Sequence, residues 1–444
     1  MTESRRTFLK QSAFVVAGTG IAGSAGAVTN SLLSGQAPSD IVNVALIGCK
    51  NMGFGVLQNH LDLPDTRCIA MCDVDRNILE ERAAGIQKKY NQKPVLYDDF
   101  RKLLENKDID AVIVSTPDHW HCLPMIYACE AGKDVYVEKP MANSIEECNL
   151  MVKAAKRYNR VVQVGQQQRS GKIWQDIMTK IKSGDLGKLR KVEIWANFHY
   201  GIGQKKVADS PVPHGVDYDF WLGPAPARNT FNDTRFHGNW RMWWDYGGGL
   251  VTDWGVHLLD MALWAGEVMT APKTILSYGA NLSFPDYAHE TFDTMSVTFP
   301  QNDYIITYEH TAGTENGPFG MGYGLRFICD NATILADRSG YRILPEKDQQ
   351  SQDKIEKFES EKGRDDHDLH SKNFVECVKS RAVTACPPEV GRQVALYAHM
   401  ANIAIRTGEY KLDWDDASNR FTNSEKANRF IVPEYRKPWV LPKV

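Results

Sequence analysis

The stretch "ALIGCKNMGFG", residues 45–55, decides the fold of the first part of the chain. It joins an apolar strand, residues 41–47, to a helical pattern that starts near Gly53. A strand, a glycine turn and a helix in this order are typical of the G-x-G-x-x-G loop that binds the phosphates of a dinucleotide. The middle glycine of that pattern falls on Lys50. Because this glycine normally lets the backbone approach a pyrophosphate closely, the lysine leaves open how the loop binds a nucleotide.

Length and composition indicate a multidomain globular protein. A chain of 444 residues exceeds what one hydrophobic core usually supports, so we expect at least two domains. A net charge of −3, with no basic stripe, gives no reason to expect nucleic acid or a membrane surface as a partner. The nine cysteines are scattered and none forms a C-x-x-C pair. We therefore expect buried free thiols, without disulfides or a zinc site.

The N-terminus carries a targeting pattern. "SRRTFLK", residues 4–10, is typical of a twin-arginine signal, and a mildly apolar run to about Ala27 follows it. That run is too short and too mild to span a membrane. We expect residues 1–35 to be a signal and linker that direct a folded protein to the periplasm of a bacterium, although a mobile basic tail is the alternative. Export in the folded state favours a tightly bound cofactor.

The first half of the chain alternates strand and helix. The apolar run "IDAVIVSTP", residues 109–117, is typical of a central parallel strand that is covered on both faces. The alternation predicts a doubly wound parallel sheet of Rossmann type over residues 40–165. Ligands bind at the carboxyl ends of such strands. The strands expected here end at Gly48, Asp73, Thr116 and Glu138.

Asp73 and Lys50 bear on the choice of cofactor. Asp73 lies 25 residues after Gly48, where a carboxylate accepts hydrogen bonds from the ribose hydroxyls and repels a 2′-phosphate. It favours NAD over NADP, and a helix N-cap is the alternative role. The ammonium of Lys50 either meets the pyrophosphate charge or points into solvent. Gly48 and Gly53 still provide the tight turn and the helix packing, so the substitution alters the site without abolishing it.

The second half lacks this alternation. Segments with stretches of period two predict five or six strands of an open, mainly antiparallel sheet with helices on one face. They lie at residues 191–200, 273–282, 290–300, 303–311 and 324–344. We expect residues 166–386 to form an α+β domain for substrate binding and oligomerisation. Residues 387–444, which open with Pro387 and Pro388, are expected to form a helix and an extension that dock on the body.

Three motifs point to a family. "STPDHWH" (115–121), "VYVEKPMANSIEE" (135–147) and "WWDYGGGLVTDWGVHLLDMALW" (243–264) resemble the Gfo/Idh/MocA oxidoreductases, the relatives of glucose-fructose oxidoreductase and inositol dehydrogenase. The resemblance runs from about residue 41 through "YRKPW", residues 435–439, and is similar to exported, signal-bearing members with a C-terminal extension. It implies an NAD(P)-dependent oxidoreductase that assembles as a homodimer or homotetramer.

The resemblance also implies roles for particular residues. The lysine of the E-K-P motif falls on Lys139, and the D-x-x-x-H pair falls on Asp253 and His257; all three are expected near the nicotinamide and the substrate hydroxyl. Together with the glycine loop, it predicts a cofactor site made of Gly48, Lys50, Asn51, Met52, Gly53, Asp73, Thr116, Pro117, His121, Glu138 and Lys139.

The chemistry of these side chains fits oxidation of a sugar alcohol. That reaction needs a base for the hydroxyl proton while hydride leaves for the nicotinamide, and histidine titrates near neutrality. His257 is the first choice as acid or base, Asp253 shares its helix face, and Lys139 favours a developing alkoxide. The alternatives are an N-cap for Asp253, a core histidine for His257 and a surface lysine for Lys139. His119 and His121 offer metal-ligand types but point apart, so we expect no metal.

Seven tryptophans between residues 195 and 264 favour a carbohydrate substrate, because aromatic faces stack on sugar rings, although core packing is the alternative. They are Trp195, Trp221, Trp240, Trp243, Trp244, Trp254 and Trp264. The candidate substrate-binding residues are Arg169, His199, Tyr200, Arg241, Trp244 and Tyr246.

Three functions remain open at this stage. The first is an NAD-dependent oxidoreductase that acts on a secondary hydroxyl of a sugar or glycoside, with C3 as one candidate carbon. The second is an NAD-dependent glycoside hydrolase that works through transient oxidation and elimination. The third is a non-catalytic sugar-binding relative whose altered loop no longer holds a nucleotide.

Overall fold

The computed structural model describes residues 40–228, 230–363 and 366–444. The predicted signal, residues 1–35, lies outside these residues. No helix within the described ranges is long and apolar enough to cross a membrane. All nine cysteines lie within them, and each is buried and free, as the scattered spacing predicts.

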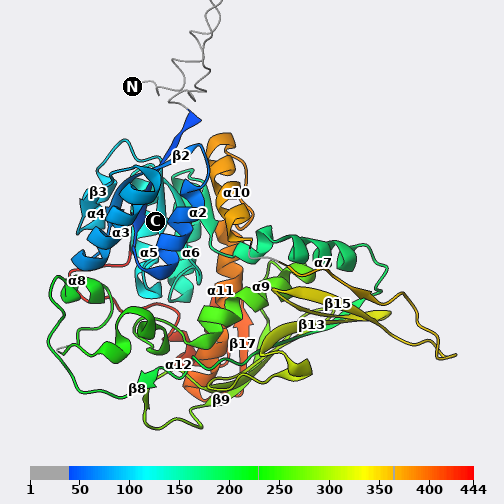
Figure 1. The fold of residues 1–444 in the computed structure, drawn as a ribbon. Helices are drawn as coiled ribbons and strands as arrows, with labels where there is room; N and C mark the ends of the chain where they lie inside the picture. The colour runs from blue at the N-terminus through cyan, green and yellow to red at the C-terminus, as the bar shows by residue number, and fades with distance from the viewer. Residues whose placement is uncertain (1–39, 229, 364–365) are drawn as a thin grey trace, which may run out of the picture. The chain divides into compact units, whose positions relative to one another are not determined.

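The first sheet has the predicted doubly wound parallel topology (Figure 1). Its strand order is β3-β2-β1-β4-β5-β6, and each neighbouring pair is parallel. The order of the strands runs outward in opposite directions from the neighbouring pair β1 and β4. This pair forms the topological switch point at which such sheets bind ligands. The strands are β1 (Val42–Ile47), β2 (Thr66–Cys72), β3 (Val95–Tyr97), β4 (Ala111–Val114), β5 (Asp134–Val137) and β6 (Val162–Val164).

Helices cover both faces of this sheet. Alternate residues of β1 explain the two layers, because Val44 and Leu46 pack on one face, whereas Ala45 and Ile47 pack on the other. One layer holds α2 (Asn51–Leu61), α3 (Arg76–Tyr90) and α10 (His367–Ser380), and the other holds α4 (Phe100–Leu104), α5 (Cys122–Glu130) and α6 (Ile145–Arg157). Helix α10 comes from the second half of the chain, so the first sheet is completed by a distant segment.

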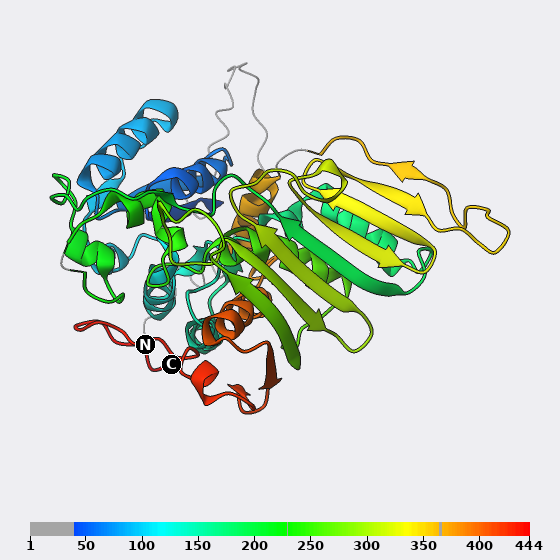
Figure 2. The same ribbon diagram turned by 90° about the horizontal axis from the view of Figure 1, so that it is seen from below.

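The second sheet is open and mainly antiparallel, as predicted (Figure 2). Its order in the described residues is β16-β15-β14-β13-β7-β12-β11-β9-β17-β18, and the β7–β12 pair is parallel. The bounds are β7 (Leu189–Ala196), β9 (Thr274–Ala280), β11 (Thr294–Pro300), β12 (Ile305–Thr311), β13 (Tyr323–Cys329), β14 (Ala332–Asp337), β15 (Gly340–Pro345), β16 (Phe358–Glu359), β17 (Lys411–Asp415) and β18 (Arg420–Phe421).

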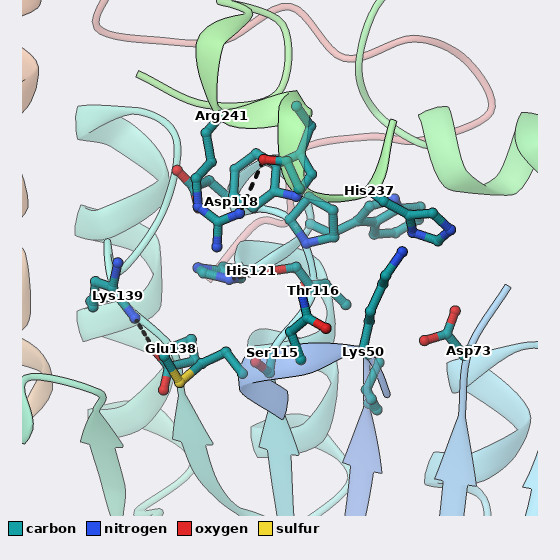
Figure 3. A pocket seen from close by; sticks show the side chains of 18 of the residues that line it. Lys50, Asp73, Ser115, Thr116, Asp118, His121, Glu138, Lys139, His237 and Arg241 are labelled. Carbon is teal, nitrogen blue, oxygen red and sulfur yellow. Dashed lines mark hydrogen bonds between the residues drawn. The ribbon is translucent and has the colours of Figure 1, made fainter. Parts of the chain in front are cut away.

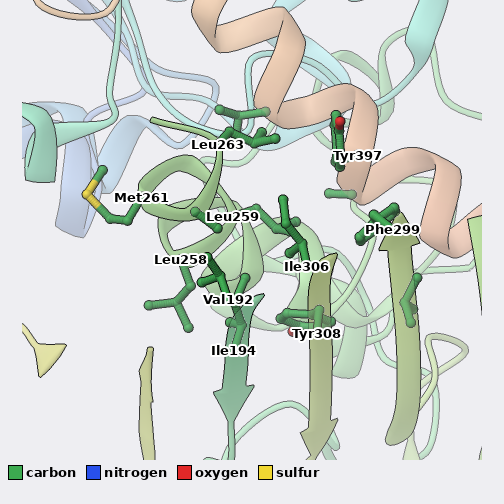
Figure 4. Close-up of a cluster of buried hydrophobic side chains, with 14 of the residues drawn as sticks. Val192, Ile194, Leu258, Leu259, Met261, Leu263, Phe299, Ile306, Tyr308 and Tyr397 are labelled. Atoms are coloured by element: carbon green, nitrogen blue, oxygen red, sulfur yellow. The ribbon is translucent and has the colours of Figure 1, made fainter. Parts of the chain in front are cut away.

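One face of this sheet packs against α7 (Lys172–Lys182), α9 (Val256–Ala265) and α11 (Pro388–Thr407). Figure 4 shows Leu259 of α9 and Tyr397 of α11 above Ile306 and Phe299 of the sheet. On the other face, alternate residues such as Tyr278 are exposed. The helix layer therefore fixes α9, which carries His257 in its first turn and follows directly on the turn that holds Asp253, against a rigid support.

The expected five or six strands are too few. Strands β16, β17 and β18 were missed because they are short and carry charged or polar residues, so their hydrophobic period is weak. Helix α11 begins at Pro388 as expected, and its partner strand β17 extends the sheet beside β9. The C-terminal extension docks on the first sheet's helices, where the Trp439 ring lies 4.8 Å from that of Trp120.

Candidate active site

A pocket of about 330 Å³ lies at the carboxyl ends of the parallel strands (Figure 3). Its floor comes from the loops that follow β1, β2, β4 and β5, and its opposite wall comes from residues 236–257. Residues from both halves of the chain therefore meet in one cavity. Its lining includes Gly48, Lys50, Asn51, Met52, Asp73, Thr116, Pro117, His121, Glu138, Lys139, Arg241, Asp253 and His257.

The glycine turn after β1 requires glycine at two positions. Gly48 has φ +90°, and an added Cβ would lie 2.5 Å from the Ser115 carbonyl oxygen. A Cβ on Gly53 would lie 2.1 Å from the Gly48 carbonyl oxygen, whereas one on Gly55 would meet nothing within 4 Å. Lys50 is the N-cap of α2 with φ −84°, which any residue adopts. The lysine therefore introduces no backbone strain into the turn.

The Lys50 side chain extends across the pocket toward His237 and passes beside Asp73 (Figure 3). Burial lowers the pKa of Lys50, and the charges of Asp75 and Asp73 partly offset that effect. Lys50 is therefore a partly buried member of the pocket lining, on the side that holds Asp73 and Asp75. Any contact with a pyrophosphate stays a prediction.

Asp73 is fixed by backbone donors at the end of β2. Its Oδ2 accepts from the Cys49 N–H at 2.6 Å, and its Oδ1 accepts from the Asp75 N–H at 2.9 Å. Burial raises the pKa of Asp73 to about 6. The N-cap of α3 is Asp75, which accepts from Asn77 and Ile78, so the N-cap alternative for Asp73 is wrong. The remaining lone pairs of Asp73 face a pocket where ribose hydroxyls would act as donors.

A segment of the second half closes over this side of the pocket. We call residues 214–223 and 236–241 the closing segment. It bonds to the β2–α3 loop through Arg76 N–H to the Gly215 carbonyl (2.9 Å) and Asp217 N–H to the Val74 carbonyl (2.9 Å). His237 Nε2 lies 3.1 Å from Asp75 Oδ2. These bonds enclose the dinucleotide side of the pocket.

Asp253 is the centre of a charged hydrogen-bond network. It lies in a π-helical turn, Val251–Gly255, directly before α9. Its Oδ1 accepts from Lys139 Nζ at 2.7 Å and Arg241 Nε at 3.1 Å, and its Oδ2 accepts from Tyr200 Oη at 2.5 Å. Burial alone would raise the pKa of Asp253, but Lys139 and Arg241 hold it well below its ordinary value. The carboxylate is therefore ionised and orients Lys139.

His257 offers the pocket a nitrogen without a partner. Its Nδ1 is buried and makes no hydrogen bond to the described residues. Burial lowers the pKa of His257 well below its ordinary value, and the positive charges of Arg338 and Lys139 lower it further. The imidazole is therefore neutral, which is the form of histidine that accepts a proton.

Comparison with known proteins gives the family. Residues 42–166 match the model of an oxidoreductase family with an NAD-binding Rossmann fold, GFO_IDH_MocA. Residues 172–304 and 349–441 match the C-terminal alpha/beta domain of the same oxidoreductase family. The chain belongs to the Gfo/Idh/MocA family. The resemblance stated from its motifs is thereby confirmed.

Individual relatives are more distant. A glycosyl hydrolase family 109 protein of Shewanella baltica is 30% identical over 204 residues, which cover 42% of this chain and 44% of the relative. The chain thus matches less than half the length of such curated relatives. An aldose-aldose oxidoreductase of Caulobacter crescentus, complexed with glycerol, superposes with a TM-score of 0.62 at 18% identity over 84% of this chain and 100% of that chain. The WlbA dehydrogenase of Bordetella pertussis, in complex with NADH and UDP-GlcNAcA, superposes with a TM-score of 0.60 at 17% identity. This match covers 84% of this chain and 99% of that chain.

The pocket fits the nicotinamide cofactor that this Gfo/Idh/MocA fold implies. The glycine turn and the N-terminus of α2 face the phosphate side, and Asp73 faces the ribose side. Thr116 Oγ1 is a second buried polar atom of the lining that has no partner among the described residues. His121 has both ring nitrogens near carbonyl oxygens, Pro140 at 2.8 Å and Thr116 at 2.9 Å, so it positions the loop.

The predicted substrate residues divide into two groups. Arg241 lines the pocket, and Tyr200 reaches it through its hydrogen bond to Asp253. The structure does not bring the other four into the lining. The Arg169 guanidinium pairs with buried Asp260 at 2.6 Å, which fixes it behind α9.

The remaining three residues lie elsewhere for equally local reasons. The His199 side chain is 72% exposed and lies 3.2 Å from Glu315. Trp244 lies under Arg406, 4.4 Å from the guanidinium carbon to the ring centroid. Tyr246 is fully buried, and its ring centroid lies 4.9 Å from that of Trp221. Of the seven tryptophans, Trp221, Trp240 and Trp254 line the pocket.

Several lining residues were not predicted. Asp118 lies inside the motif at residues 115–121 but was not predicted as a site residue. It lines the pocket, and burial raises its pKa well above the ordinary value. His237, Arg338 and His367 come from segments without a motif, so only the fold brings them to the pocket. No group of three or more His, Cys, Asp or Glu side chains in the described ranges has the geometry to hold a metal ion. His119 Nε2 instead lies 3.1 Å from the Trp221 carbonyl oxygen.

Proposed function

We propose that the protein is an exported, NAD-dependent oxidoreductase that transfers hydride between bound nicotinamide and a secondary hydroxyl of a sugar or glycoside, with C3 as one candidate carbon. The observation that carries this proposal is that one pocket brings His257 together with the Lys139–Asp253 pair and the glycine turn. The Nδ1 atom of His257 has no hydrogen-bond partner among the described residues. A proton acceptor and a cation thus face the ends of the nucleotide-binding strands.

Each side chain has a distinct part in the reaction. NAD, when bound, supplies the hydride acceptor. His257 takes the hydroxyl proton, because its imidazole is neutral. The Lys139 ammonium stabilises the negative charge that develops on the substrate oxygen. Asp253 does not exchange the proton, because its pKa is far below neutrality; it holds Lys139 in place at 2.7 Å.

Two features support tightly bound NAD. Asp73 presents a carboxylate at the ribose side, which would repel the 2′-phosphate of NADP. The closing segment encloses that side through main-chain hydrogen bonds, so release requires the segment to move. A twin-arginine pattern with folded export fits a cofactor that is inserted before transport. The homodimer or homotetramer stays a prediction.

The case for a sugar substrate rests on the lining and on relatives. Trp240 and Trp254 line the pocket beside polar groups, as sugar-binding sites require. The structural neighbours include an aldose-aldose oxidoreductase and a dehydrogenase complexed with UDP-GlcNAcA.

The similarity to proteins named glycosyl hydrolase family 109 favours a second candidate, an NAD-dependent glycoside hydrolase. This reaction needs a further proton to leave the carbon next to the oxidised one before the aglycone departs. Exchange of that C–H with solvent deuterium therefore distinguishes it from simple dehydrogenation.

The test begins with mass spectrometry of the ligand that the natively purified protein releases on denaturation. The proposal expects NAD at about one per chain. A panel of glycosides is then assayed for reduced nicotinamide, aglycone release and deuterium incorporation, with His257→Ala as the matched control that keeps nucleotide but loses turnover. Reduced nicotinamide without aglycone supports the oxidoreductase. Aglycone with deuterium at the neighbouring carbon supports the hydrolase, and absence of nucleotide supports the non-catalytic alternative.

A further inference from the structure

A second cavity, of about 600 Å³, lies beside the short two-stranded ribbon of β8 (Gln204–Lys205, labelled in Figure 1) and β10 (Tyr287–Ala288). It shares no lining residue with the active-site pocket. Its described lining contains Lys206, Arg235 and His289 but no aspartate or glutamate. The cavity is within the usual size range of small-molecule sites, roughly 300–1,000 Å³.

Arg235 is the unusual residue of this cavity. Arg235 as a whole residue is only 9% exposed to solvent. Nη2 donates to the Thr230 carbonyl oxygen at 2.7 Å, whereas Nε is buried without a partner. No carboxylate in the described residues forms an ion pair with it, and its guanidinium carbon lies 5.7 Å from the centroid of the Trp243 ring. A guanidinium stays charged, so this cavity contains a fixed positive charge.

Three other poorly exposed arginines of the chain each form an ion pair with a carboxylate. Arg169 pairs with Asp260 at 2.6 Å, Arg241 pairs with Asp253 at 3.1 Å, and Arg228 pairs with Asp245. Burying a charge without a partner is costly, and these pairs show how this fold normally compensates for it. The exposed carboxylate of Asp209 lies close enough for its charge to interact with Arg235, but the two form no ion pair. An anion that pairs directly with Arg235 is therefore expected from outside the chain.

The uncharged side chains of the lining indicate what kind of anion fits this cavity. The Ser283 hydroxyl makes no side-chain hydrogen bond to the described residues, and His289 uses only Nδ1, toward the Thr291 carbonyl oxygen at 3.0 Å. These groups leave hydrogen-bonding capacity for hydroxyls. Phe284 and Tyr287 supply apolar surface. The cavity thus combines one anion receptor with partners for a hydroxylated ring.

We propose that this cavity is a binding site for a sugar acid, such as a hexuronate, whose carboxylate pairs with Arg235 and whose hydroxyls bond to the amide, hydroxyl and imidazole groups around it. The wall residues Asn232–Arg235 continue directly into residues 236–241 of the closing segment. The sugar acid therefore binds on the far side of the same stretch that forms the active-site wall.

The test is isothermal titration calorimetry on the full chain with its nucleotide bound. The probes are D-glucuronate, D-glucose and inorganic sulfate. Glucuronate should bind, and Arg235→Gln should weaken it by at least about tenfold, as expected for loss of a charge-assisted hydrogen bond. Ser283→Trp, an exposed substitution that fills the cavity mouth, should do the same without removing the Thr230 contact, and Arg235→Lys should restore part of the affinity.

The active-site control is His257→Ala, which should leave glucuronate binding unchanged. Equal binding of glucose would overturn the role of the charge, and equal binding of sulfate would reduce the site to a bare anion receptor and overturn the sugar-acid assignment. Glucuronate binding that responds to His257→Ala but not to Ser283→Trp would place it in the active site and refute the second site. Since the readout is heat of binding, these outcomes do not depend on the proposed redox activity.

Discussion

Replacement of Asp253 by asparagine tests the electrostatic centre of the active site. The change keeps the side-chain shape but removes the charge that faces Lys139 Nζ at 2.7 Å and Arg241 Nε at 3.1 Å. With an effective dielectric constant of about 20, each lost attraction corresponds to roughly 5–6 kcal/mol before desolvation is counted. Removing one partner of a buried ion pair costs about 3–5 kcal/mol in practice. We expect Asp253→Asn to lower the free energy of unfolding by about 3–5 kcal/mol.

The assay is urea denaturation of the nucleotide-bound protein, followed by tryptophan fluorescence and circular dichroism. Tyr200→Phe is the matched control, because it removes only the hydrogen bond to the charged Oδ2 and should cost about 1.5–3 kcal/mol. The double variant should be less destabilised than the sum, since the tyrosine bond depends on the carboxylate. A loss below about 1 kcal/mol for Asp253→Asn would refute the assignment of Asp253 as the ionised counter-charge of two cations.

Four further results are expected. His257→Ala should lower turnover by two to four orders of magnitude while nucleotide stays bound, because Nδ1 has no protein partner to lose; stopped-flow measurement of nicotinamide reduction checks it. Nucleotide retention should fall as pH drops through about 6, because NAD needs the ionised form of Asp73 and burial raises that pKa; retention by Asp73→Asn should be weaker and independent of pH, and a persistent pH dependence there would contradict the assignment. Lys50→Gly should weaken nucleotide retention about tenfold in equilibrium dialysis, whereas unchanged or tighter retention would make the ammonium a bystander. Burial raises the pKa of Glu147 from 4.5 to about 7, so the protonated side chain contributes roughly 3 kcal/mol to the free energy of unfolding. This contribution is present at low pH and is lost as pH rises through about 7. The free energy of unfolding of Glu147→Gln, measured by denaturation, should lack this pH dependence.

The parallel sheet could be predicted because its strands are buried on both faces. Residues 111–114 therefore form an unbroken apolar run, and the glycines at 48 and 53 mark a turn whose backbone leaves no room for a side chain. Strand β3 was missed because it is three residues long at the sheet edge, where only partial burial is required. Edge elements are specified by tertiary contacts more than by local pattern.

The location of a residue in the pocket could be predicted where backbone position alone determines it. Lys139 lies two residues after the end of β5, so its position is determined by the strand. Prediction of substrate residues by type and neighbourhood was less accurate, as Arg169 shows. Its partner Asp260 lies about one helical turn beyond His257 on α9, where it is fully buried and outside the pocket lining. Residue type identifies a possible hydrogen-bond donor, but the direction of the side chain depends on packing.

The distribution of unpartnered atoms bears on which reaction the pocket supports. Glu138 accepts from Gln167 Nε2 at 2.8 Å and from the Lys139 N–H at 3.2 Å, and Tyr200 donates to Asp253. Among the titratable side chains that line the pocket in the described residues, His257 is the one with a buried, unpartnered nitrogen or oxygen atom. Removal of a hydroxyl proton requires one such base, whereas elimination of an aglycone requires another for the neighbouring C–H. The lining also holds Asp118, a second titratable group whose carboxyl makes no side-chain hydrogen bond within the described residues. Exchange of the neighbouring C–H with solvent deuterium is therefore the measurement that separates dehydrogenation from glycoside cleavage.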